Sequence, residues 1–114
     1  MCFLKYRNAI QIPTSNITTH LLGCVWAPIT EELTFRGVLY AHFRERHGWL
    51  LSATAVGTLF AVVHPQGWTV YPVLAAVGFV FASIREWRGS ILPSMVAHAF
   101  HNGIVLTLAV LMLR

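Results

Sequence analysis

The stretch WAPITEELTFRGVLYAHF, residues 26–43, places Glu31, Glu32 and Arg36 inside a segment that is otherwise almost wholly apolar. The apolar run around it, from about 20 to 43, is as long as the ~20 residues that a helix needs to cross a bilayer. A charge inside such a segment is costly unless it faces a cavity or a partner. The stretch therefore predicts a membrane-type helix and marks the place where function is expected.

The composition of the whole chain agrees with that interpretation. Of the 114 residues, 56% are hydrophobic and 11% are charged, and the mean hydropathy is +0.63. A soluble domain usually has about a quarter of its residues charged. The net charge of +4 comes from basic residues scattered between apolar runs. Because they form no basic stripe, nucleic acid is not an expected partner.

Four apolar segments follow one another, at about 20–43, 49–64, 68–84 and 90–113, each interrupted by a polar or proline-containing break. Their lengths are close to the ~20 residues of a membrane helix. We therefore predict an all-α, multi-pass transmembrane bundle of about four helices, with the lipid bilayer as its partner. Residues 1–19 are expected to form a short N-terminal segment at the membrane interface, and 20–114 the intramembrane core.

The loops around 44–46 and 85–88 carry arginines and would share one face of the membrane if the segments alternate in direction. The positive-inside rule makes that face cytoplasmic, and we expect a bacterial cell membrane.

Pro28 interrupts the first segment in one of two ways. Either it kinks the helix and frees a carbonyl one turn back, or the helix starts there. Both predict irregular backbone just before Glu31.

Depth from the arginine face was counted at ~1.5 Å per residue along each predicted helix. Glu31 and Asn102 then lie ~18 Å deep, His64 ~21 Å and His98 ~12 Å. Polar residues from three segments thus fall in one slab of the membrane. Intramembrane ionisable residues are functional candidates by default.

The spacing within the first segment predicts an ion pair. Glu32 and Arg36 are four residues apart and share a helix face, so they can neutralise each other. Glu31 points about a quarter-turn away and has no local cation. We expect Glu32 and Arg36 to have a mainly structural role.

The other two segments each present a pair at the same spacing. His98 and Asn102 lie four apart and offer two hydrogen-bonding groups side by side. Phe60 lies one turn before His64 and can pack on its ring. A carboxylate, an imidazole and a histidine–asparagine pair are what activating a water and stabilising an oxyanion require.

Each of these residues also has a structural explanation. His64 precedes Pro65 and can simply cap a helix end, and His98 with Asn102 can form hydrogen bonds between helices. His101 is expected to be a neighbour of the site. A shared depth for all of them favours a functional site.

Three motifs in order, EELTFR (31–36), FAVVH (60–64) and HAFHN (98–102), resemble those of the CAAX protease and bacteriocin-processing family, also called Abi. The resemblance spans about residues 26–110 and is to its type II CAAX prenyl protease-like members. It implies an intramembrane endopeptidase acting on a membrane-associated peptide or a lipidated protein. Eukaryotic members remove the last three residues of prenylated proteins, and bacterial relatives are linked to bacteriocin maturation, self-immunity or peptide processing.

Carried over motif by motif, the resemblance implies that Glu31 and His64 activate the hydrolytic water while His98 and Asn102 hold the oxyanion. The supporting residues would be Glu32, Arg36 and Phe60. No cofactor and no metal are expected, since the family's proposed glutamate mechanism needs none and the sequence has no H-E-x-x-H pair. A zinc site assembled from Glu31, His64 and His98 across three helices is the alternative.

Family members usually carry further membrane helices before the first motif, whereas almost nothing precedes it here, as in a fragment or a minimal member. Two other functions remain open. One is a catalytically idle membrane protein that binds a peptide or confers immunity. The other is a small transporter or proton relay, because intramembrane Glu and His are used there too.

Overall fold

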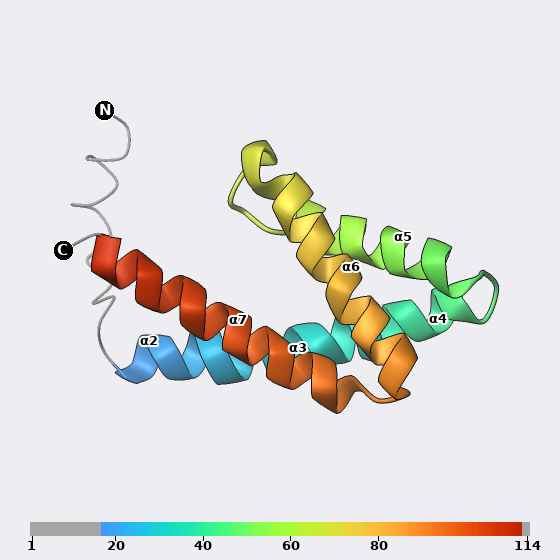
Figure 1. Cartoon of the computed structure of the whole chain (residues 1–114), viewed down its shortest axis with the longest axis horizontal. Helices are drawn as coiled ribbons and strands as arrows, with labels where there is room; N and C mark the ends of the chain where they lie inside the picture. The colour runs from blue at the N-terminus through green and yellow to red at the C-terminus, as the bar shows by residue number, and fades with distance from the viewer. Residues whose placement is uncertain (1–16, 113–114) are drawn as a thin grey trace.

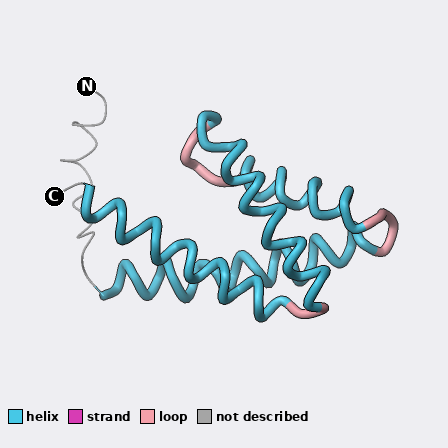
Figure 2. Tube along the Cα trace, in the orientation of Figure 1, coloured by secondary structure: helices cyan, strands magenta, loops and turns pink. Residues whose placement is uncertain are grey.

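The computed structural model describes residues 17–112, which form four helical segments joined by short loops (Figures 1 and 2). The all-α prediction is confirmed, and residues 17–112 contain no strand. The predicted interfacial segment 1–19 lies mostly outside the described residues. Its last three positions already belong to the first helix.

The first helical segment covers residues 17–44 and changes its winding along its length. It consists of α2 (Ile17–Leu21), the π-helical η1 (Leu22–Trp26), α3 (Ala27–Glu32), the π-helical η2 (Leu33–Leu39) and α4 (Tyr40–Arg44). The helix does not start at Pro28, because η1 precedes it in helical backbone. Residues 27–30, just before Glu31, are regular α-helix, so the predicted place of the irregularity was wrong. The irregular backbone lies earlier, in the π-helical η1, and π-helical turns are often found at functional sites.

Three further helices follow, α5 (Trp49–Val62), α6 (Tyr71–Arg88) and α7 (Ile91–Met112). A short 3₁₀ turn, η3 (Trp68–Val70), leads into α6. In Figure 1, α5 and α6 form a hairpin on one side of the molecule, and α7 runs back along the first segment. The first and last helices therefore face each other over much of their length.

Two predicted helix ends were wrong, one by two residues and the other by four. The second helix ends at Val62 rather than 64, because Pro65 has no N–H and the chain turns just before it. The third helix continues past 84 to Arg88 and ends at Gly89, whose φ of 66° suits a C-terminal glycine. The polar residues 85–88 were taken for a loop because they are charged.

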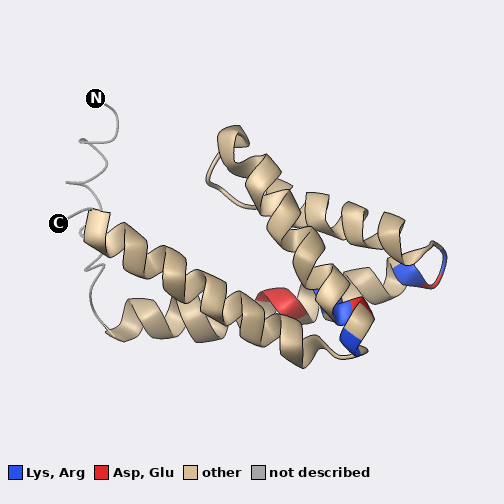
Figure 3. Ribbon diagram, viewed as in Figure 1, with Lys and Arg blue, Asp and Glu red and all other residues tan. Residues whose placement is uncertain are grey.

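That charged end of α6 is held by an interhelical cluster. Arg44 pairs with Glu86 at 3.1 Å, and the hydroxyl of Tyr40 donates to Glu86 at 2.7 Å. In the ribbon of Figure 3, the charged positions of the described residues lie mainly at these loop ends, with a separate acidic stretch in α3. The cluster fastens the end of the first segment to the end of α6.

The α5–α6 hairpin is packed through glycine. A Cβ added to Gly57 would lie 2.7 Å from the backbone nitrogen of Phe79 and 2.8 Å from the carbonyl oxygen of Ala75. Close backbone approach through small residues is typical of helix pairs in membranes. This contact sets the distance between the helix that leads to His64 and the helix that carries Gly78.

Two helical stretches within residues 17–112 are long and apolar enough to cross a membrane, namely 68–88 and 91–112. The second helix has 14 residues and is ~21 Å long, shorter than the ~30 Å hydrocarbon core. The first segment, which carries the buried charges of Glu32 and Arg36, is not among these two stretches. Passage of all four helices through a bilayer stays a prediction.

Candidate active site

The predicted ion pair between Glu32 and Arg36 is present and fully buried. Nη1 of Arg36 lies 3.0 Å from Oε1 of Glu32. Nη2 of the same guanidinium donates to the carbonyl of Gly78 on α6 at 2.9 Å. The guanidinium carbon of Arg36 lies 4.8 Å from the ring centroid of Phe60 and 5.2 Å from that of Phe81. Arg36 thus joins the first segment to α5 and α6 as well as neutralising a carboxylate.

His98 connects the two adjacent glutamates. Its Nδ1 lies 2.8 Å from Oε1 of Glu32, and its Nε2 lies 3.3 Å from Oε2 of Glu31. The ring is buried and stacks on Phe81 with centroids 4.7 Å apart. Because a carboxylate accepts the Nδ1 hydrogen bond, Nδ1 carries a proton. Nε2 is therefore the atom that His98 offers to Glu31 and its surroundings.

His64 lies in the turn just after α5. Its Nδ1 contacts the carbonyl oxygen of Phe60, so Nδ1 is the donor and Nε2 of the neutral ring keeps its lone pair. Nε2 lies 3.8 Å from Oε2 of Glu31, and the ring packs on Phe60 as expected, with centroids 4.3 Å apart. One nitrogen thus binds the helix end, as the capping interpretation expects, while the other faces Glu31.

Asn102 lies one turn after His98 on α7. Its Nδ2 donates to the carbonyl oxygen of Gly23 on the first segment at 2.8 Å. The hydrogen bond between helices that the sequence suggested is therefore present. Because the partner is a carbonyl, the nitrogen side of the carboxamide faces the first segment, and its second N–H remains available.

Glu31, His64, His98 and Asn102 line one cavity of about 420 Å³. The prediction that these residues meet is confirmed in its geometry, while their roles stay predictions. Glu31 lies at the centre, since one of its oxygens faces both imidazoles. The wall also contains residues from α5, the following turn, η3, α6 and α7, namely Phe60, Gln66, Val70, Val73, Leu74, Val77, His101 and Val105.

Sequence reasoning missed several of these contributors. Gln66 stands next to Pro65 in an uncharged turn, and nothing in its spacing connected it to the motifs. Phe81 and Gly78 lie on α6, which carries none of the three motifs, so their contacts to His98 and Arg36 had no sequence signal. His101 was expected to be a neighbour and does line the cavity.

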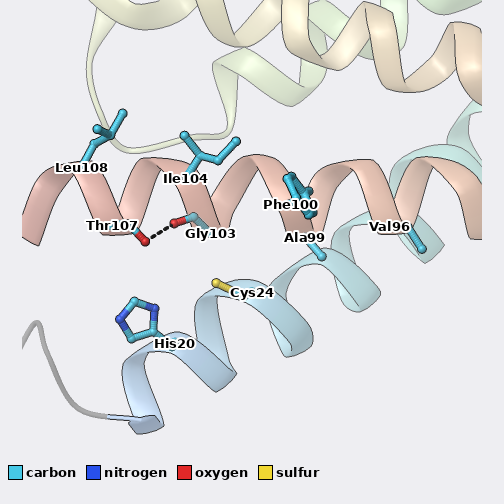
Figure 4. A pocket seen from close by; sticks show the side chains of 9 residues that line it. All are labelled: His20, Cys24, Val96, Ala99, Phe100, Gly103, Ile104, Thr107 and Leu108. Carbon is cyan, nitrogen blue, oxygen red and sulfur yellow. Dashed lines mark hydrogen bonds between the residues drawn. The ribbon is translucent and has the colours of Figure 1, made fainter.

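A second cavity of about 600 Å³ lies between the start of the first segment and α7 (Figure 4). Its polar side chains are His20, Cys24 and Thr107, and the hydroxyl of Thr107 already donates to the carbonyl of Gly103 at 2.7 Å. No carboxylate lines it. It lies on the side of α7 away from His98 and Asn102, since the two linings share no α7 residue. The candidate chemistry therefore belongs to the smaller cavity.

Among residues 17–112, no group of three or more His, Cys, Asp or Glu side chains is arranged to hold a metal ion. Glu31, His64 and His98 were the alternative ligand set. The Nδ1 atoms of both histidines are engaged by Phe60 and Glu32, which leaves their Nε2 atoms facing Glu31. Metal independence of any reaction stays a prediction.

Comparison with protein families gives a match that covers most of the chain. The family model described as "Type II CAAX prenyl endopeptidase Rce1-like" matches residues 13–104. The matched range includes all three motifs and every candidate residue. A comparison with curated proteins found no match, and a comparison with solved structures found none either.

Proposed function

Because this chain belongs to the Rce1-like family of type II CAAX prenyl endopeptidases, which makes it a membrane protein of the CAAX-type intramembrane protease kind, we propose that it hydrolyses peptide bonds through Glu31. One observation carries the proposal. A single oxygen of Glu31 faces Nε2 of His98 at 3.3 Å and Nε2 of His64 at 3.8 Å at the edge of a cavity. The site thus combines a carboxylate base with two imidazoles.

Glu31 and His64 activate the water in this proposal. Their separation of 3.8 Å is too long for a direct hydrogen bond, and one water beside the two atoms can contact both. The side chain of Glu31 is 28% exposed, so it is accessible from the cavity. The carboxylate or the Nε2 lone pair takes the proton, and the resulting hydroxide attacks the substrate carbonyl carbon.

His98 and Asn102 stabilise the oxyanion that this attack forms. With Nδ1 bound to Glu32, Nε2 is the only ring nitrogen of His98 that can donate to it, and this requires the doubly protonated ring. The second N–H of Asn102 is the other donor. Fixed donors aimed at developing charge are usually the largest single contribution to catalysis. The amine that leaves takes its proton from Glu31 or His64, which returns the site to its starting state.

The substrate that fits is a membrane-associated peptide or lipidated protein, as the family name suggests. The apolar part of the cavity lining includes Val70, Val73, Leu74, Val77 and Val105. Such a wall favours an extended apolar or lipid-bearing chain over a charged one. We place the protein as a multi-pass protein of the bacterial cell membrane, with no cofactor and no metal in the reaction.

The experiment is cleavage of peptides ending in a CAAX sequence, with and without a prenyl group, by purified protein in detergent containing a metal chelator. Mass spectrometry in ¹⁸O-water should show one labelled oxygen in the new carboxylate. Glu31→Ala should be inactive, and Glu45→Ala, which changes an exposed loop glutamate, should retain activity. Stoichiometric zinc whose removal abolishes cleavage would contradict the metal-free mechanism. If none of the peptides is cleaved while labelled peptide binds, the idle-protein alternative is favoured.

A further inference from the structure

The hydrogen bond from Asn102 to Gly23 joins positions that are 79 residues apart in the sequence. Gly23 belongs to η1, near the start of the first segment, and precedes all three motifs. Helix carbonyls are normally occupied by a backbone N–H four residues later. The backbone must therefore explain why the Gly23 carbonyl is open to a side-chain donor.

Two features of the backbone release the Gly23 carbonyl. Ala27, the donor expected at the α-helical spacing of four, donates instead to Leu22, five residues back, because η1 is wound as a π-helix. At that wider spacing the donor for Gly23 would be residue 28, which is Pro28 and has no N–H. Both usual helical donors are thus removed, and the carbonyl is left for a side chain.

A glycine at position 23 also brings this carbonyl close to α7. A Cβ built there would lie 2.7 Å from Cδ1 of Leu106, inside any normal contact distance. Leu106 is one turn beyond Asn102 on the same helix. Because Cδ1 is the end of a flexible side chain, an alanine at 23 requires that Leu106 move aside, and a larger residue would press the first segment away from α7.

We propose that Pro28 and Gly23 are positioning residues for Asn102. A carboxamide can flip by a half-turn and would then offer oxygen instead of nitrogen to the cavity. Only the NH₂ end of the Asn102 carboxamide can donate to the Gly23 carbonyl, so this bond fixes the flip with the second N–H directed toward the oxyanion. The inference rests on the proposed function, in which Asn102 stabilises that oxyanion. It assigns a role to the π-helical turn and to a proline outside the three motifs.

The first test is Pro28→Ala, which supplies an N–H able to compete for the Gly23 carbonyl. We expect kcat to fall by at least ~10-fold, at most to the ~100- to 1000-fold of a lost oxyanion donor, with KM nearly unchanged. The matched control is Pro93→Ala. Pro93 lies in the first turn of α7, where a helix needs no N–H, so its kcat should equal that of the wild type.

The second test separates positioning from packing. Gly23→Ala should lower kcat modestly, because the flexible end of Leu106 must move aside for the methyl, and adding Leu106→Ala should restore much of the loss. If position 23 mattered only for packing, the double variant would lose more contacts and be worse than the single one. Recovery in the double variant supports the proposal, and further loss overturns it. This test remains informative even if Pro28→Ala, which shortens a buried side chain, folds poorly.

The third measurement does not need activity. The side-chain amide signals of ¹⁵N-asparagine-labelled protein in detergent, assigned with Asn102→Ala, should show one Asn102 proton protected from solvent exchange. In Pro28→Ala that protection should be lost. Unchanged protection in a folded Pro28→Ala protein would overturn the proposal, whatever its kcat. A wild type that cleaves no peptide but shows this protection would contradict the proposed function and leave the positioning intact.

Discussion

Nδ1 of His98 lies 2.8 Å from Oε1 of Glu32, the same oxygen that binds Arg36. The second glutamate of the first motif is therefore shared between a structural cation and a ring of the candidate site. Sequence spacing paired Glu32 with Arg36 alone. The structure adds a second task, which is to hold the proton of His98 on Nδ1 and turn Nε2 toward Glu31.

Arg36→Ala should reduce stability more than any loop arginine does. It leaves a fully buried carboxylate without its cation and removes the side-chain hydrogen bond to the Gly78 carbonyl. Breaking a buried pair by removing one partner costs about 3–5 kcal/mol. Thermal unfolding in detergent should show a clearly lower midpoint than for Arg46→Ala, an exposed loop control. Equal midpoints for the two variants would refute this role.

Replacing both partners should separate stability from turnover. In Glu32→Gln with Arg36→Met, no buried charge is left unpaired, so the unfolding midpoint should recover relative to Arg36→Ala. Turnover should stay reduced by between ~10-fold and ~10⁴-fold, the range for carboxylates that orient a functional histidine. Full turnover in the double variant would show that the hydrogen bond between Glu32 and His98 is not needed for the reaction.

The sequence predicted the helical class, the order of the four helices and the meeting of Glu31, His64, His98 and Asn102. It did so because membrane helices have a strong apolar signal and because polar groups at one depth must find partners. What it missed depends on side-chain direction across helices. The contact of His98 with Glu32, and the stacking of Phe81 on His98, leave no periodic trace in the chain.

The irregular backbone of the first segment was also predicted only in part. Pro28 predicted irregular backbone just before Glu31, whereas the π-helical turn lies earlier, at Leu22–Trp26. Spacing alone did not reveal that the turn frees the carbonyl of Gly23 for Asn102, because that needs the three-dimensional approach of α7. The helix ending at Arg88 was mispredicted since charge was read as a loop, whereas Glu86 is bound by Arg44.

Gly57→Ala should loosen the α5–α6 hairpin. The new methyl would collide with backbone atoms of Phe79 and Ala75, which cannot move as a flexible side chain can. Overpacking of this kind costs about 1–3 kcal/mol. Gly48→Ala is the matched control, because a Cβ there meets nothing within 4 Å. Thermal unfolding should separate the two variants, and a Gly57→Ala midpoint equal to that of the control would show that the close approach is dispensable.

Asn102→Ala should lower kcat by ~100- to 1000-fold with little change in KM, as expected for one oxyanion donor. His101→Ala is the neighbouring comparison, since His101 lines the same cavity and has no assigned role in the reaction. Its effect on kcat should be below ~10-fold, well short of a lost oxyanion donor. Steady-state kinetics on one cleaved peptide measures both. If His101→Ala lowered kcat as much as Asn102→Ala, the assignment of the oxyanion donor to Asn102 would be contradicted.

The central claim is that Glu31 is the base, and the turnover of Glu31→Gln tests it most directly. The amide keeps the size of the side chain and removes its ability to accept the proton of water. Cleavage of a wild-type substrate should fall to background while the unfolding midpoint stays near that of the wild type. A folded Glu31→Gln protein that cleaves at the wild-type rate would contradict the account.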